Sequence, residues 1–150
     1  MKSKMVSLLL IAVCLMNSYC LADDFLVSFL TGNYVIIGQK PDSDLTYHGT
    51  LFLELNNDNL TIVRNIDNTI VKGTATIDSV TADQISVLRI QFNENNKDYE
   101  GTFLISSDLD NYGRLTGYIY LQDNSTQNVG LEAWFADYGQ LSKKSHSNRN

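Results

Sequence analysis

Cysteine is nearly missing from this sequence: Cys14 and Cys20 are the only two among 150 residues, and both lie close to the N-terminus. Residues 23–150 therefore offer no disulfide framework, no thiol nucleophile and no thiolate ligand for zinc. Histidine is almost as scarce, so a Ser-His-Asp triad would depend on His48 alone, because His146 lies in a polar tail. Glycine-rich phosphate loops are also absent. We expect a protein that is not an enzyme, with no catalytic residues, no metal site and no cofactor.

The N-terminal segment resembles a signal peptide. Two lysines precede an apolar run over residues 5–16, and the small residues Cys20 and Ala22 stand at the −3 and −1 positions before Asp23. The run is shorter than the roughly 20 residues that a membrane-spanning helix needs. We expect residues 1–22 to be removed, leaving an exported protein, periplasmic or extracellular, with no transmembrane segment in its mature form.

Positive charge is scarce in the remaining 128 residues. Nine Lys and Arg stand against seventeen Asp and Glu, a formal charge of −8, and no basic patch interrupts residues 23–137. Nucleic acid is therefore not an expected partner. Residues 23–137 are long enough for one domain, whereas residues 138–150 are polar and basic with little to bury, and we interpret them as a flexible tail.

Between Gly32 and Phe135 one pattern repeats along the chain. Short runs rich in Val, Ile, Thr, Tyr and Phe alternate apolar and polar residues, and clusters of Asn, Asp, Ser or Gly separate them. The pattern predicts eight strands near residues 33–40, 46–55, 60–66, 69–78, 84–93, 98–106, 114–122 and 128–136. Connections this short make neighbouring strands antiparallel. We expect an all-β, eight-stranded, up-and-down barrel, because closure removes the two exposed edges.

A glycine recurs at the start of an alternating run in four of these strands, at Gly49, Gly73, Gly101 and Gly117. Counting by twos places all four on the inward face. Two interpretations remain open. A small, strongly coiled barrel needs residues without Cβ at its corners, or the glycines leave room for a ligand.

Four short motifs carry a resemblance to a known family: Gly32-x-Tyr34-x-Ile36-x-Gly38-x-x-Pro41-Asp42, Tyr47-x-Gly49-Thr50, Leu115-x-Gly117 and Gly130-x-Glu132-x-Trp134. Over residues 32–134 the chain resembles small exported bacterial lipocalin-like (calycin-type) barrels. The resemblance implies an eight-stranded antiparallel barrel. It does not extend to true lipocalins, whose opening Gly-x-Trp motif would need Trp near Tyr34. Nor does it extend to biotin-binding barrels, whose tryptophan-rich cage cannot be built from Trp134 alone.

Arg64 is the most informative charged residue. Alternation with Leu60 and Ile62 places it on the inner face of its strand, while Glu132 and Trp134 share one parity in the last strand. An isolated buried charge is costly, so Arg64 and Glu132 should pair with each other or with a bound ion if both point inward. Three interpretations stay open: Arg64 lies outside, the pair is structural, or Arg64 orients a carboxylate or phosphate with its guanidinium fork.

Aromatic residues fall on both faces. Tyr34, Tyr47 and Tyr99 join Trp134 on the inner parity, where they line a pocket mouth or fill the core. Four others have the outward parity: Phe52, Tyr118, Tyr120 and Phe135. They either form a patch for a protein partner or for self-association, or they are scattered surface aromatics.

Residues 108–113 begin like a calcium-binding loop, but the twelfth position is Ile119 where a bidentate Glu is needed, and we expect a turn.

Two functions remain. The first is a binding protein that holds a small, anionic or amphipathic ligand inside the barrel, with Arg64, Glu132, Trp134, Tyr34, Tyr47 and Tyr99 as its site. The second is a filled barrel that contacts an exported or extracellular protein, as an inhibitor or adhesion factor.

Overall fold

The computed structural model describes residues 25–57, 59–105 and 115–137. The expected signal peptide, the loop over residues 108–113 and the expected tail over residues 138–150 lie outside these residues. The eight strands are β1 (Gly32–Gln39), β2 (Thr46–Asn56), β3 (Asn59–Ile66), β4 (Thr69–Val80), β5 (Ile85–Glu94), β6 (Lys97–Leu104), β7 (Leu115–Leu121) and β8 (Gly130–Ala136). Each lies within a few residues of the strand that the alternating pattern predicts.

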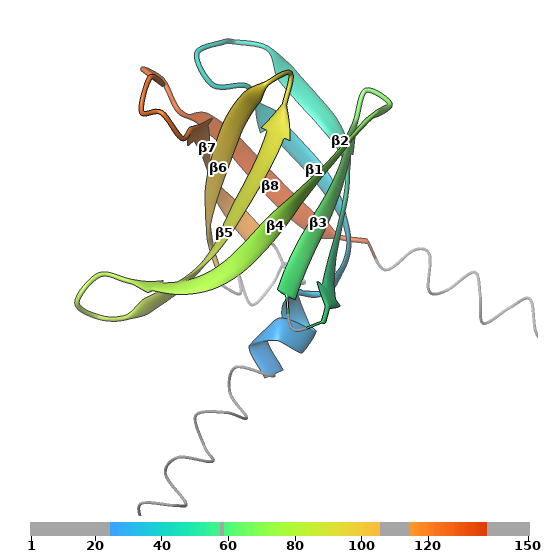
Figure 1. Ribbon diagram of the computed structural model, residues 1–150, viewed down its shortest axis with the longest axis vertical. Coiled ribbons are helices and arrows are strands. Elements are labelled where there is room, and N and C mark those ends of the chain that lie inside the picture. Colours follow the sequence, from blue (N-terminus) through green and yellow to red (C-terminus); the bar gives the residue numbers. More distant parts are fainter. Residues whose placement is uncertain (1–24, 58, 106–114, 138–150) are drawn as a thin grey trace, which may run out of the picture. The chain divides into compact units, whose positions relative to one another are not determined.

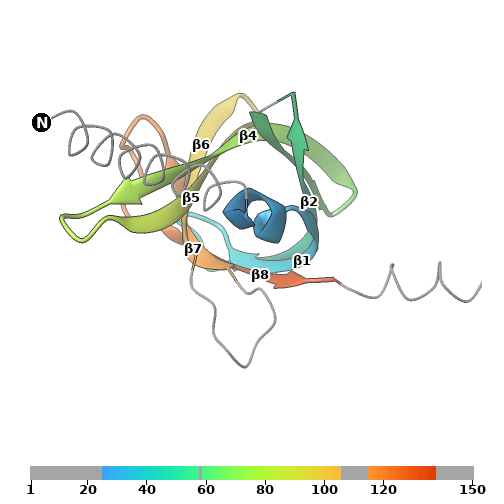
Figure 2. The same cartoon turned by 90° about the horizontal axis from the view of Figure 1, so that it is seen from below.

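The strands form one closed barrel in sequence order (Figure 1). Every strand pairs antiparallel with the next, and β8 closes the ring against β1 through pairs such as Ile36 with Trp134. Figure 2 shows the strands arranged around the ring. The predicted all-β, eight-stranded, up-and-down barrel is therefore confirmed.

Tight turns set the register of two hairpins. The β3–β4 turn places Asp67 and Asn68 at φ of 51° and 64°, and the β5–β6 turn places Asn95 and Asn96 at 54° and 60°. Positive φ at both central residues matches the right-handed twist of the flanking strands, and Asn and Asp tolerate it well. These residues therefore connect the strands without loops that would shift the pairing.

Inward-facing side chains fill most of the barrel. The largest completely buried residues of its interior come from six strands and include Trp134, Phe103, Ile36, Leu51, Leu53, Ile62, Leu88 and Ile90. Leu55 shares the inward parity of β2 but is 51 % exposed, because it lies one residue before the end of its strand. Alternation therefore identifies the face of a side chain correctly and does not reveal where the barrel ends.

The recurring glycines allow neighbouring strands to approach closely. A Cβ on Gly117 would lie 2.7 Å from the Cα of Phe103 and still closer to the carbonyl oxygen of Thr102. At Gly49 and Gly73 a Cβ would likewise meet a backbone carbonyl of the adjacent strand. Backbone atoms already occupy this space, so these three positions favour the barrel-corner interpretation over room for a ligand.

Residues 25–30 form a short helix in a compact unit separate from the barrel, which begins at Gly32. After the helix, the Thr31 amide donates a hydrogen bond to the Val27 carbonyl (3.1 Å), and the Thr31 hydroxyl donates one to the Ser28 carbonyl (3.2 Å). Within the described parts of the chain, no helix has the length and apolar character required to cross a membrane.

Candidate functional site

A buried ion pair links two strands that are not neighbours. Arg64 on β3 donates from both terminal nitrogens to Glu132 on β8, at 2.8 Å to Oε1 and 2.7 Å to Oε2. The two side chains are 3 % and 0 % exposed. Because β1 and β2 lie between β3 and β8 in the ring, the pair spans the barrel interior. Both side chains point inward and pair with each other, so the interpretation that Arg64 lies outside is wrong.

Two further donors complete the environment of Glu132. The Tyr47 hydroxyl donates to Oε2, and the Trp134 indole nitrogen donates to Oε1 at 2.5 Å. The carboxylate thus accepts four hydrogen bonds, two at each oxygen. A buried charge is tolerable only when its lone pairs are satisfied in this way. We name Tyr47, Arg64, Glu132 and Trp134 the Glu132 cluster.

Gly38 lets Tyr47 reach Glu132. It pairs with Tyr47 on one side and with Glu132 on the other, so all three share the inner face of adjacent strands. A Cβ on Gly38 would lie 2.5 Å from Cζ of Tyr47 and 2.6 Å from its hydroxyl oxygen. The missing side chain is therefore the space that the tyrosine ring occupies.

Aromatic rings extend the cluster in two directions. The Arg64 guanidinium carbon lies 4.5 Å from the ring centre of Phe92, whose ring stacks on Tyr99 at 5.3 Å and 15°. On the other side, Trp134 packs against Tyr34 at 5.5 Å. Cation–π and stacking contacts of this kind hold the guanidinium in one orientation.

Burial and charge act together on the titratable groups. Burial, followed by the charge of Glu132, raises the pKa of the Tyr47 hydroxyl far above its ordinary value. Burial alone would lower the pKa of Arg64, but the charge and hydrogen bonds of Glu132 outweigh it and raise that pKa. Tyr47 therefore stays a neutral donor and Arg64 a cation over the whole physiological range.

A recess of about 160 Å³ lies at the end of the barrel next to the cluster. Its wall comes from the β1–β2 loop, the end of β3 and the β5–β6 hairpin. The lining residues are Lys40, Pro41, Ser43, Tyr47, Arg64, Ile66, Phe92, Glu94, Asn95 and Tyr99. Of the six residues proposed from the sequence, Arg64, Tyr47 and Tyr99 reach this recess.

One hydrogen-bonded clamp fixes a loop of this recess. Asp42 Oδ1 accepts hydrogen bonds from the amides of Gln127 (2.9 Å) and Asn128 (2.7 Å), and the Asp42 amide donates to the Asn128 carbonyl (2.9 Å). Asp42 adopts a φ of 52°, which its short polar side chain tolerates. The loop that carries Lys40 and Pro41 is thereby tied to the β7–β8 loop.

The remaining proposed residues lie deeper. Trp134 and Glu132 support the recess without lining it, and Tyr34 is a core residue, 4 % exposed, in contact with Trp134. Sequence reasoning missed Phe92, although its parity in β5 matches that of the buried Leu88 and Ile90. The ligand-binding role of all six residues stays a prediction.

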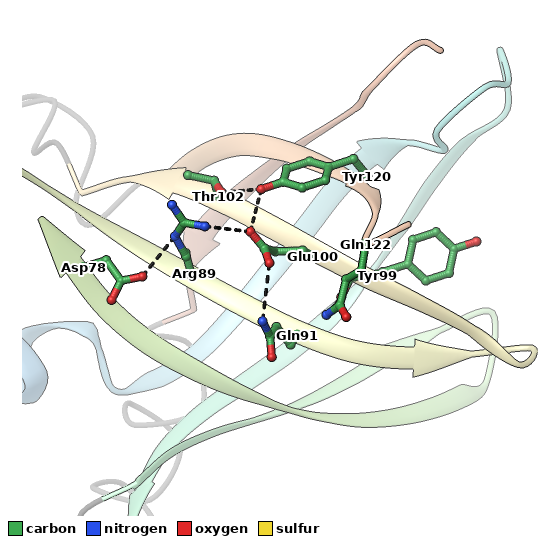
Figure 3. Close-up of polar contacts among 8 residues, drawn as sticks. All are labelled: Asp78, Arg89, Gln91, Tyr99, Glu100, Thr102, Tyr120 and Gln122. Carbon is green, nitrogen blue, oxygen red and sulfur yellow. Dashed lines mark hydrogen bonds and ion pairs between the residues drawn. The ribbon is translucent and has the colours of Figure 1, made fainter. Parts of the chain in front are cut away.

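A second polar network lies on the outside of the barrel (Figure 3). Arg89 on β5 forms ion pairs with Asp78 on β4 (3.0 Å) and Glu100 on β6 (2.9 Å), and the Tyr120 hydroxyl on β7 donates to Glu100 (2.7 Å). Burial alone would raise the pKa of Glu100, but hydrogen bonds from Tyr120 and Gln91 and the charge of Arg89 lower it. The Tyr120 hydroxyl is thus held in this network, and the part of Tyr120 in an aromatic patch with Tyr118 stays a prediction.

Two comparisons with known proteins found no match for this chain. No protein-family model matches the chain, and no match was found among the curated proteins. Among the described residues, no group of three or more His, Cys, Asp and Glu side chains is placed to hold a metal ion.

We expect Glu132→Gln to lower the free energy of unfolding by about 3–5 kcal/mol, because it leaves Arg64 charged and buried without its partner. The double variant Arg64→Met/Glu132→Leu should recover only part of this loss, because it removes both charges but leaves the Tyr47 hydroxyl and the Trp134 indole N–H buried without their acceptor. Glu100→Gln is the matched control at the partly exposed pair and should cost about 1 kcal/mol or less. Urea unfolding measures all three, and a Glu132→Gln variant that loses no more stability than Glu100→Gln would contradict the assignment.

Alkaline pH should destabilise the protein through Tyr47. Its pKa is higher in the folded chain than in the unfolded chain, so below about pH 10 both states keep the proton and stability is unaffected. Above that pH the unfolded chain ionises first, and the free energy of unfolding falls by up to about 1.4 kcal/mol per pH unit from this one group. Tyr47→Phe should show a shallower decline between pH 9 and 11. Identical slopes would show that Tyr47 is not buried against Glu132.

Proposed function

We propose that the protein binds a small molecule in the recess beside the Glu132 cluster. The observation that carries this proposal is that Arg64, a buried cation held by Glu132, forms part of the wall of an open recess. Buried ion pairs stabilise a fold less than apolar residues of the same size do, so a function for the cation is the simplest reason to keep it. The signal-peptide pattern in residues 1–22 supports a role outside the cytoplasm.

The packing of the barrel limits the size of the ligand. Completely buried side chains such as Trp134 and Phe103 fill much of the interior, and the recess that Arg64 borders has a volume of about 160 Å³. A cavity of about 150 Å³ in another protein holds one benzene molecule, whereas drug-sized ligands need roughly 300 Å³ or more. The proposed ligand therefore has the size of one substituted ring, and it enters the end of the barrel instead of its centre.

The lining indicates the chemistry of the ligand. Phe92 and Tyr99 offer an apolar, stacked wall for a planar group. Arg64 uses both terminal nitrogens for Glu132 while its side chain still borders the recess, and Lys40 adds a second cation at the wall. We infer a planar, mostly apolar molecule with one carboxylate or carbonyl acceptor. The sequence-based hypothesis was different: there both terminal nitrogens of the Arg64 guanidinium bind the ligand, whereas here they bind Glu132.

Pre-organisation supports the same proposal. Arg64 is fixed by two hydrogen bonds and by its contact with Phe92, and Asp42 clamps the neighbouring loop. A ligand would therefore bind without ordering these groups, which is one of the main costs of association. Even so, a single-ring ligand offers few contacts, and its dissociation constant should be ~1 mM.

The experiment is an NMR titration of the protein with benzoate, followed through backbone amides. We expect saturable shifts at Phe92, Asn95 and Tyr99 with a dissociation constant of ~1 mM. Lys40→Met and Tyr99→Ala should each weaken binding about fivefold, whereas Tyr118→Ala, on the outer face, should leave it unchanged. Shifts that are absent, or that respond equally to all three variants, would refute the proposal. Benzamide as the second probe separates a carboxylate requirement from a carbonyl one.

A further inference from the structure

The outer surface of the barrel is divided by charge. Outward positions on β4, β5 and β6 carry Asp78, Arg89 and Glu100, which are paired with one another (Figure 3). The outward positions from β7 through β8 and β1 to the middle of β2 contain no Asp, Glu, Lys or Arg. Twelve of these positions make up what we name the uncharged face: Thr116, Tyr118, Leu131, Ala133, Phe135, Val35, Ile37, Gln39, Thr46, His48, Thr50 and Phe52.

The apolar members of this face are exposed and adjacent. Tyr118, Leu131, Ile37 and Val35 are 53, 50, 49 and 42 % exposed. The register places Tyr118 beside Leu131 and Ile37 beside Ala133 on neighbouring strands. Scattered exposed apolar residues need no explanation, but a contiguous set without charge has the composition of an interface core.

The face has both a hollow and a projection. A hollow of about 550 Å³ is lined by outward residues such as Ile37, Thr46, His48, Thr116 and Leu131, and at its base by the inward-parity residues Gly38, Tyr47 and Glu132. Tyr118 stands next to Leu131 at the side of this hollow. When two copies meet about a twofold axis, a side chain beside a hollow on one copy can enter the same hollow on the other.

The net charge of the chain and the lack of charged residues on this face indicate which partner can bind there. The chain has a formal net charge of −6, so two copies repel each other wherever their acidic surfaces meet. The uncharged face lets them approach without that cost, whereas it holds no Asp, Glu, Lys or Arg with which to select a charged foreign partner. The closed barrel has no unpaired edge strand for a partner to extend, so contact must be sheet against sheet. We propose that this face joins two copies of the chain in a symmetric homodimer.

Sedimentation velocity from about 1 to about 200 µM tests the proposal. Three proteins are compared: the wild type, the Leu131→Lys variant and the matched control Ile70→Lys. Ile70 lies on the outer face of β4 and is 65 % exposed, so the same change is made outside the uncharged face. We expect the wild type and Ile70→Lys to reach the dimer mass at the upper concentrations and Leu131→Lys to stay monomeric.

Tyr118→Lys is the second variant and should behave like Leu131→Lys, which keeps the test valid if one substitution disturbs folding. A wild type that is monomeric throughout would overturn the proposal and point to another partner for this face. Variants at the uncharged face that dimerise as well as Ile70→Lys would overturn it too. These outcomes are read separately from the benzoate titration, because neither Leu131 nor Tyr118 lines the recess, although Tyr47 borders both the recess and the hollow.

Discussion

The buried carboxylate of Glu132 must accept a full set of hydrogen bonds, and the rest of the barrel depends on this constraint. A buried charge is tolerated only with a full set of donors, and here they come from three strands: Arg64 from β3, Tyr47 from β2 and Trp134 from β8 itself. A shift of one residue in the pairing of any of these strands would turn its donor to the outside. The cluster therefore specifies the register of the barrel as well as the chemistry at one end.

The same constraint separates the barrel into a filled part and a small open part. Trp134 must sit deep enough to donate to Glu132, and there its ring packs against Phe103 at 4.5 Å. Aromatic packing of this kind fills this part of the interior. Phe92 and Tyr99 stack on the opposite side of Arg64, and their position bounds the recess. The volume of this recess therefore limits the proposed ligand to the size of one ring.

Most of the fold, and part of the site, followed from the sequence. Alternation with period two identified all eight strands and the inward parity of Arg64 and Glu132, because burial on one face of a strand leaves that signal in the sequence. The contact of Tyr47 with Glu132 could not be predicted, since it requires that Gly38 stand between them in two neighbouring pairings. Parity predicted that Tyr120 points outward, but parity alone does not reveal the hydrogen bond of its hydroxyl to Glu100.

Trp134 offers the most direct measurement, because it is the one tryptophan in the chain and its indole N–H gives a single NMR signal. If Glu132 is saturated by buried donors, this proton bonds to a carboxylate and should resonate far downfield. It should also exchange with solvent only when the barrel unfolds globally. An indole proton that exchanges as fast in the folded protein as in urea would show that the carboxylate is open to water, and the cluster as described would be wrong.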